Sequence, residues 1–141
     1  MIDISDKNIV PRSATASGEI VLKISTVQAI ENKKIKKGDV FEFSKAAALL
    51  AIKNTHNLLP HTHPIPLENA DLNFIINENR IRVECTVKAH YKTGVEMEAL
   101  VGVSIALLTI WDMVKYLEKD EKGQYPITSI KNIEVIKKEK G

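Results

Sequence analysis

Four stretches of the chain alternate apolar and polar side chains, which is the pattern of a β-strand with one buried face. In the first of them Ile20, Leu22 and Ile24 fall on one face. The pattern predicts strands over residues 18–25, 71–77, 80–91 and 127–136. Because only a short turn at residues 77–79 separates the second strand from the third, we expect these two to form a hairpin.

A long helical pattern lies in the second half of the chain. From Ala99 to Trp111 no residue is charged, and a cap at Thr93 or Gly94 would start a helix that continues to about Asp120. A helix that is apolar nearly all round must be covered nearly all round. The sequence therefore predicts a deeply buried helix here.

Two shorter helical patterns lie in the first half. Thr26 is a suitable N-cap for a short helix over residues 27–32, and Asp39 is one for a helix over residues 40–57. Three prolines follow in residues 58–67. Since proline cannot donate a backbone hydrogen bond, we expect neither helix nor central strand in that stretch.

The order of these elements is β-α-β-β-α-β with one extra short helix, which is the ferredoxin-like pattern. The sequence thus predicts an α+β fold in which helices cover one face of an antiparallel sheet. We expect a single domain over residues 1–141, in which residues 1–17 form an N-terminal arm and residues 137–141 a solvated tail.

Composition narrows the class of protein. A length of 141 residues fits one domain, and 44% hydrophobic with 27% charged residues is typical of a globular protein. The net charge of +2 is too small to indicate nucleic-acid binding. Cys85 is the only cysteine and the chain opens with no signal-peptide pattern, so we expect a cytoplasmic protein. The uncharged run is shorter than a bilayer requires, so we expect no membrane contact.

The end of the long helical pattern carries the first candidate chemistry. Asp112 and Lys115 are three residues apart on one helix face and can pair. One interpretation is a structural ion pair of small energetic worth. The other is a functional pair, because a desolvated lysine loses its proton more easily and becomes a base, although the carboxylate beside it opposes that change.

Two loops carry further candidates. Lys37 ends a run of basic residues, which is either a solvated loop or an anion-binding loop with one catalytic lysine. His61 and His63 lie among the prolines, where one histidine can act as a proton shuttle because an imidazole exchanges protons near neutral pH. Zinc held together with His56 is the less favoured alternative, because no cysteine or acidic ligand has metal spacing there. We expect Cys85 and His90, both within the third strand, to be structural.

Five blocks of sequence follow one known family. The longest is Lys92–Leu100, which reads KTGVEMEAL, and the most informative of the others is LTIWDMVK at residues 108–115. The remaining blocks are the chain opening, KGDV at residues 37–40 and the proline-bounded histidine loop. Through these motifs the chain resembles the cyclic pyranopterin monophosphate synthases, the molybdenum cofactor biosynthesis protein C family.

The resemblance implies a lyase that converts 3′,8-cyclo-7,8-dihydro-GTP to cyclic pyranopterin monophosphate and releases pyrophosphate. It implies no cofactor and a homo-oligomer, a hexamer built as a trimer of dimers with the site between subunits. The implied catalytic residues are Lys37, His63, Asp112 and Lys115. The implied substrate-binding residues are His61, Thr62, His63, Met97 and Glu98, with Arg12 as a further candidate.

An alternative from another class is a non-catalytic ferredoxin-like module that binds RNA or a small ligand. The predicted strands lack the paired glycine and aromatic residues typical of an RNA-recognition sheet, which disfavours the RNA form of this alternative. Release of pyrophosphate from the cyclised nucleotide would distinguish the lyase from either form.

The spacing of the implied site residues predicts a shared site. Glu98 and Asp112 lie on one predicted helix, about 21 Å apart along its axis. Catalytic groups must reach within about 3 Å of the reacting atoms, so one helix cannot easily bring both to one reacting centre. We expect the Asp112 end to meet loops of a neighbouring subunit, so that Lys37 and Lys115 of one site come from different chains.

Overall fold

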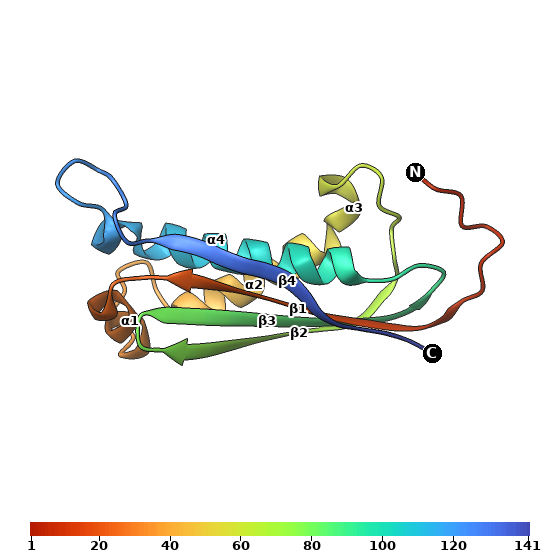
Figure 1. Cartoon of the computed structure of the whole chain (residues 1–141), viewed down its shortest axis with the longest axis horizontal. Helices are drawn as coiled ribbons and strands as arrows, with labels where there is room; N and C mark the ends of the chain where they lie inside the picture. Colours follow the sequence, from red (N-terminus) through yellow and green to blue (C-terminus); the bar gives the residue numbers. More distant parts are fainter.

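The computed structural model describes all residues 1–141 as one four-stranded antiparallel sheet with helices packed on it (Figure 1). The α+β ferredoxin-like prediction is confirmed. The strands lie in the order β2-β3-β1-β4. Their bounds are β1 Val10–Val21, β2 Leu67–Asn77, β3 Arg80–Tyr91 and β4 Ser129–Lys140; the helices are α1 Ile24–Glu31, α2 Val40–Lys53, α3 Thr55–Leu58 and α4 Glu96–Glu118.

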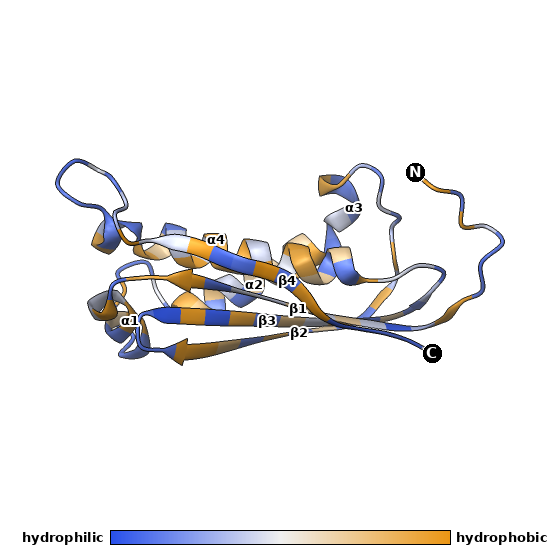
Figure 2. Cartoon of the chain, in the orientation of Figure 1, coloured by the Kyte–Doolittle hydropathy of each residue, from blue (hydrophilic) through white to orange (hydrophobic).

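The hairpin of β2 and β3 forms as the sequence predicts. The register pairs Asn77 with Arg80, and Glu78 in the turn between them has a φ of 53°, the left-handed conformation common in such turns. Along β3 the buried positions alternate with half-buried ones, and Figure 2 shows hydrophobic and hydrophilic positions alternating there. One face of the sheet is therefore apolar and covered.

The core lies between that face and helices α2 and α4 (Figure 1). Gly102 allows α4 to lie close, because a Cβ there would be 2.8 Å from both the Cys85 Sγ atom on β3 and the Ile52 Cδ1 atom on α2. Cys85 is fully buried, as expected of a small apolar side chain, and burial raises the pKa of its thiol to about 12.

Four strand boundaries differ by four residues or more from the sequence prediction. β1 ends at Val21, so that Ile24 belongs to α1, and β2 already begins at Leu67. β1 begins at Val10, inside the expected arm. The alternating pattern does not reveal this part of the strand, because the positions buried under α4 are the small residues Ala14, Ala16 and Gly18 rather than large apolar ones. β4 continues to Lys140 through the expected tail, in pairing with the start of β1. The side chains of this last segment remain exposed, so the backbone hydrogen bonds of the strand and an ion pair from Lys138 to Glu96 hold it.

Only one of the predicted helix caps is confirmed. The Asp39 carboxylate accepts a hydrogen bond from the Glu42 backbone N–H at 3.1 Å, which confirms it as the cap of α2. That helix stops at Lys53, and the short α3 follows it. The prediction of Thr26 as a cap is wrong, since Thr26 lies inside α1. The prediction of Thr93 or Gly94 as the cap of α4 is also wrong: the cap is Val95, whose apolar side chain makes no capping hydrogen bond.

A buried carboxylate, which no sequence pattern predicts, joins three elements. Glu118, at the end of α4, has no exposed surface. Its oxygens accept hydrogen bonds from the Lys23 backbone N–H, the Thr26 hydroxyl and the Thr128 hydroxyl. This arrangement ties the start of α1 and the approach to β4 to the last turn of α4.

One side of α4 is not covered within a single chain. Leu108 is 54% exposed and Met97 is 39% exposed, while Val101, Ile105 and Trp111 are half-buried. By length and apolar composition α4 could cross a membrane, but half of its apolar stretch is buried in the fold, as in a core helix. The uncovered side forms an apolar stripe along the helix.

Candidate functional site

The site residues expected from the sequence fall into two groups at opposite ends of α4. The helix begins beside α3 and the N-terminal segment and ends beside α1 and the start of α2 (Figure 1). We call the first group the histidine pocket and the second the lysine cluster. They are separated by most of the length of the helix.

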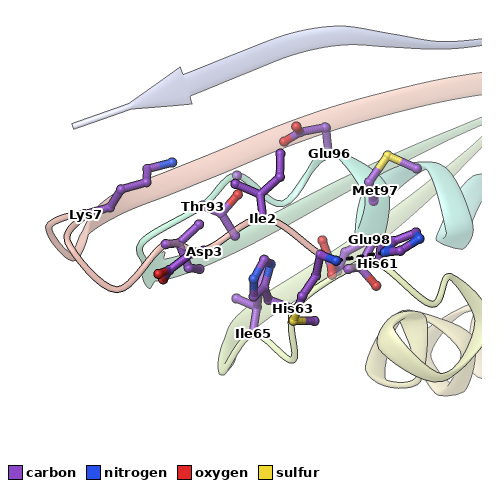
Figure 3. Close-up of a pocket in the computed structure, with 14 residues that line it drawn as sticks. Ile2, Asp3, Lys7, His61, His63, Ile65, Thr93, Glu96, Met97 and Glu98 are labelled. Carbon is purple, nitrogen blue, oxygen red and sulfur yellow. Dashed lines mark hydrogen bonds between the residues drawn. The ribbon is translucent and has the colours of Figure 1, made fainter.

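The histidine pocket is a cavity of about 650 Å³ (Figure 3). Its walls come from the proline-bounded loop, the first turn of α4 and the N-terminal segment. Figure 3 shows Lys7 on the far side of the pocket from His61. Five of the expected substrate-binding residues line it: His61, Thr62, His63, Met97 and Glu98.

Local hydrogen bonds hold the histidine loop. The Thr62 hydroxyl and backbone N–H both donate to the Leu59 carbonyl, at 2.7 Å and 3.1 Å, which closes a turn. The amino nitrogen of Met1 lies 3.0 Å from His61 Nδ1. His56 stands apart on α3, and no group of His, Cys, Asp or Glu side chains converges to hold a metal ion.

Glu98 is the most deeply buried of the acidic residues that line the pocket. It is 4% exposed, and burial raises the pKa of its carboxyl above the ordinary value, with a smaller contribution from the charge of Glu96. The neighbouring Glu96 carboxylate lies close to Gly94 and pairs with Lys138 of β4 at 3.3 Å. The first turn of α4 thus offers a carboxyl group that can exist as a proton donor.

The lysine cluster centres on Asp112. The Lys115 ammonium lies 3.2 Å from Asp112 Oδ1, and the Lys37 ammonium lies 3.5 Å from Oδ2 and donates to the Asp112 backbone carbonyl at 2.9 Å. The hydrogen bond from Lys115 and the charges of both lysines lower the pKa of Asp112. Asp112 is therefore ionised at neutral pH, and the cluster carries a net positive charge.

This geometry corrects one sequence prediction. Lys37 and Lys115 meet around Asp112 within one chain, whereas we expected them to come from different chains. The reason is that the loop between α1 and α2 folds back onto α4 of its own chain. The expected desolvation is also absent within one chain, because the side chains of Lys37 and Lys115 are 44% and 43% exposed.

Comparison with known proteins identifies the family of the whole chain, including both groups of residues. The model of the MoaC family matches residues 1–141. The chain belongs to the MoaC family. A relative from Sulfurisphaera tokodaii, named a probable cyclic pyranopterin monophosphate synthase, is 57% identical over 138 residues, which cover 98% of this chain and 91% of the relative.

Other members of the MoaC family are nearly as similar. A probable cyclic pyranopterin monophosphate synthase from Pyrococcus horikoshii is 53% identical over 140 residues, covering 99% of this chain and 88% of the relative. A protein from Methanothermobacter thermautotrophicus, named a probable cyclic pyranopterin monophosphate synthase accessory protein, is 52% identical with the same coverage.

Arg12 is the candidate that the structure does not bring to either group. It is 7% exposed and donates to the backbone carbonyls of Tyr91 and Lys92, at 3.5 Å and 3.2 Å. It lines a separate depression between the start of β1 and the end of β4. Within one chain Arg12 holds the segment that leads to α4, and its role as a substrate contact stays a prediction.

The N-terminal segment also lines the histidine pocket, although no argument from residue types or spacing predicted a role for it. Asp3 and Lys7 line the pocket, although the arm carries no strand or helix pattern. Hydrogen bonds from the Ser5 hydroxyl and backbone N–H lower the pKa of the Asp3 carboxyl. The available signal was the family-like chain opening, to which both residues belong.

Replacing Glu98 by glutamine is expected to raise the melting temperature at pH 8 and to leave it nearly unchanged at pH 4. A raised pKa in the folded state means that stability is lost as pH rises from the unfolded toward the folded pKa, and the neutral amide avoids that loss. Thermal melts at the two pH values measure this. Equal shifts at both values would contradict the assigned cause, and exposed Glu121→Gln is the control.

Proposed function

We propose that this protein is a cyclic pyranopterin monophosphate synthase, a lyase of molybdenum cofactor biosynthesis. The proposed reaction converts 3′,8-cyclo-7,8-dihydro-GTP to cyclic pyranopterin monophosphate and releases pyrophosphate. The observation that carries the proposal is the match to the MoaC family over the whole chain, together with relatives that bear this name. The two residue groups supply chemistry that suits such a substrate.

The lysine cluster suits the phosphates of the substrate. Lys37 and Lys115 present ammonium groups that can bind phosphate oxygens and stabilise negative charge as the cyclic phosphate closes. Asp112 holds the two lysines in a fixed relation.

The histidine pocket suits the proton transfers of the purine rearrangement. His63 is a candidate proton shuttle because an imidazole exchanges protons near neutral pH. Glu98, with its raised pKa, is a candidate acid in the same cavity. Met97 and the backbone of the His61–His63 loop would contact the base and ribose.

A complete site requires both groups, and we propose that two copies of the chain supply them. Glu98 and Asp112 are separated by about 21 Å along α4, and the apolar stripe lies between them. A second copy packed against this stripe would bury exposed Leu108 and bring its own α4 end near the histidine pocket. We propose a homohexamer arranged as a trimer of dimers, acting in the cytoplasm.

Purified protein incubated with the cyclised nucleotide tests the function. We expect equimolar pyrophosphate and cyclic pyranopterin monophosphate, measured by an enzyme-coupled phosphate assay and by mass spectrometry. GTP itself is the control substrate and should release nothing. Binding of the cyclised nucleotide without pyrophosphate release would contradict the proposal and favour a non-catalytic ligand-binding module.

A further inference from the structure

The segment that carries Lys37 is anchored to α4 by an interaction next to that residue. The backbone N–H of Lys36 donates a hydrogen bond to the Tyr116 hydroxyl at 3.0 Å. The Lys36 ammonium lies 5.5 Å from the centroid of the Tyr116 ring, which adds a cation–π contact. The main chain beside Lys37 is thus held by a side chain of α4.

The far end of the same segment is held by the same helix. The Lys23 ammonium donates to the Leu117 carbonyl at 2.9 Å, and Glu118 accepts the Lys23 backbone N–H. At the Lys36 anchor, the carbonyl of buried Ile35 accepts a hydrogen bond from the Gly38 backbone N–H at 3.1 Å, which closes a turn over Lys36 and Lys37. The segment from Lys23 to Gly38 therefore has fixed points at both ends on the last turns of α4.

Tyr116 lies next to the residues of the lysine cluster on α4. Tyr116 follows Lys115 directly and lies one helical turn after Asp112, so it shares a face with the carboxylate that both lysines contact. A single turn of α4 therefore carries both the Asp112 carboxylate, which pairs with Lys37, and the hydroxyl that holds the backbone beside Lys37. The ion pair alone would hold Lys37 poorly, because exposed pairs contribute little and a free lysine side chain is flexible.

We propose that Tyr116 is a positioning residue that fixes the Lys37 ammonium against Asp112. The proposal rests on the proposed function, in which Lys37 acts on the substrate. Tyr116 acts through the backbone of Lys36 and does not itself need to touch the substrate. Its loss should therefore lower the rate of the chemical step more than it weakens substrate binding.

The test is Tyr116→Phe, which removes the hydroxyl and keeps the ring. We expect kcat to fall about three- to tenfold, the worth of one hydrogen bond, with KM changed less than kcat. The melting temperature should change little, because the site is at the surface. Tyr125→Phe is the matched control, since Tyr125 contacts Trp111 through its ring and not its hydroxyl.

A second measurement separates this inference from the proposed function. Brief labelling with an amine-reactive reagent, read by mass spectrometry, should show faster modification of Lys37 in Tyr116→Phe and an unchanged rate at Lys33. In the Lys37→Ala protein, Tyr116→Phe should cause no further loss of activity. Unchanged kcat and Lys37 labelling would overturn the positioning role. Full activity of Lys37→Ala would instead overturn the catalytic role of Lys37.

Discussion

Replacing Lys115 by alanine is expected to lower kcat by about 10²–10⁴-fold, the usual cost of removing a general acid–base group. Lys115 contacts Asp112 at 3.2 Å beside Lys37, in a cluster whose positive charge suits a polyphosphate substrate. The remaining lysine cannot replace it, because one ammonium cannot occupy both positions. Steady-state kinetics with the cyclised nucleotide measure the loss.

The fold should survive this replacement. The Lys115 side chain is 43% exposed, so its ion pair with Asp112 contributes only about 0–1 kcal/mol to stability. Lys119→Ala, an exposed lysine one turn further along, is the control and should keep full activity. Full specific activity of Lys115→Ala together with a lower melting temperature would indicate a structural ion pair and contradict the catalytic role.

Replacing His63 by glutamine is expected to lower kcat by a similar factor, about 10²–10⁴. Glutamine keeps a polar side chain of similar reach but cannot exchange protons near neutral pH. His63 lines the same cavity as the buried acid Glu98, so its loss removes one of two candidate proton-transfer groups. Steady-state kinetics with the cyclised nucleotide measure the loss.

His56 provides the control for this prediction. It lies on α3, outside the histidine pocket, so His56→Gln should keep nearly full activity. Metal analysis of the purified protein distinguishes the remaining alternative. Stoichiometric zinc that is lost on His63 replacement would contradict the proton-shuttle role and favour a metal site.

Local patterns predicted the elements whose stability is local or whose buried face is apolar. The alternation in β3 and the Asp39 cap appear where the sequence places them. The start of β1 could not be predicted in this way, because its buried positions carry small residues. Their size suits the close packing of α4 against the strand, which the alternating pattern does not reveal. Thr26 looked like a cap because nothing in sequence reveals its distant partner Glu118.

In the candidate site, too, local spacing predicted the contacts within one element but not those between elements. Helical spacing identified the pair Asp112 and Lys115, and the pair forms. Spacing could not place Lys37 beside them, since that depends on how the loop between α1 and α2 folds back onto α4. The resemblance supplied Glu98 as a site residue, but its raised pKa depends on burial that only the three-dimensional structure provides.

In the proposed enzyme, each active site combines the histidine pocket of one subunit with the lysine cluster of another. Mixing inactive His63→Gln and Lys115→Ala proteins under conditions of verified subunit exchange tests it most directly. We predict recovery of about a quarter of wild-type activity, since random pairing restores one intact site in each mixed dimer. Lys37→Ala mixed with Lys115→Ala should stay inactive, because both residues belong to one cluster. No recovery in verified His63→Gln and Lys115→Ala mixed oligomers, or full activity of a monomer, would contradict the claim.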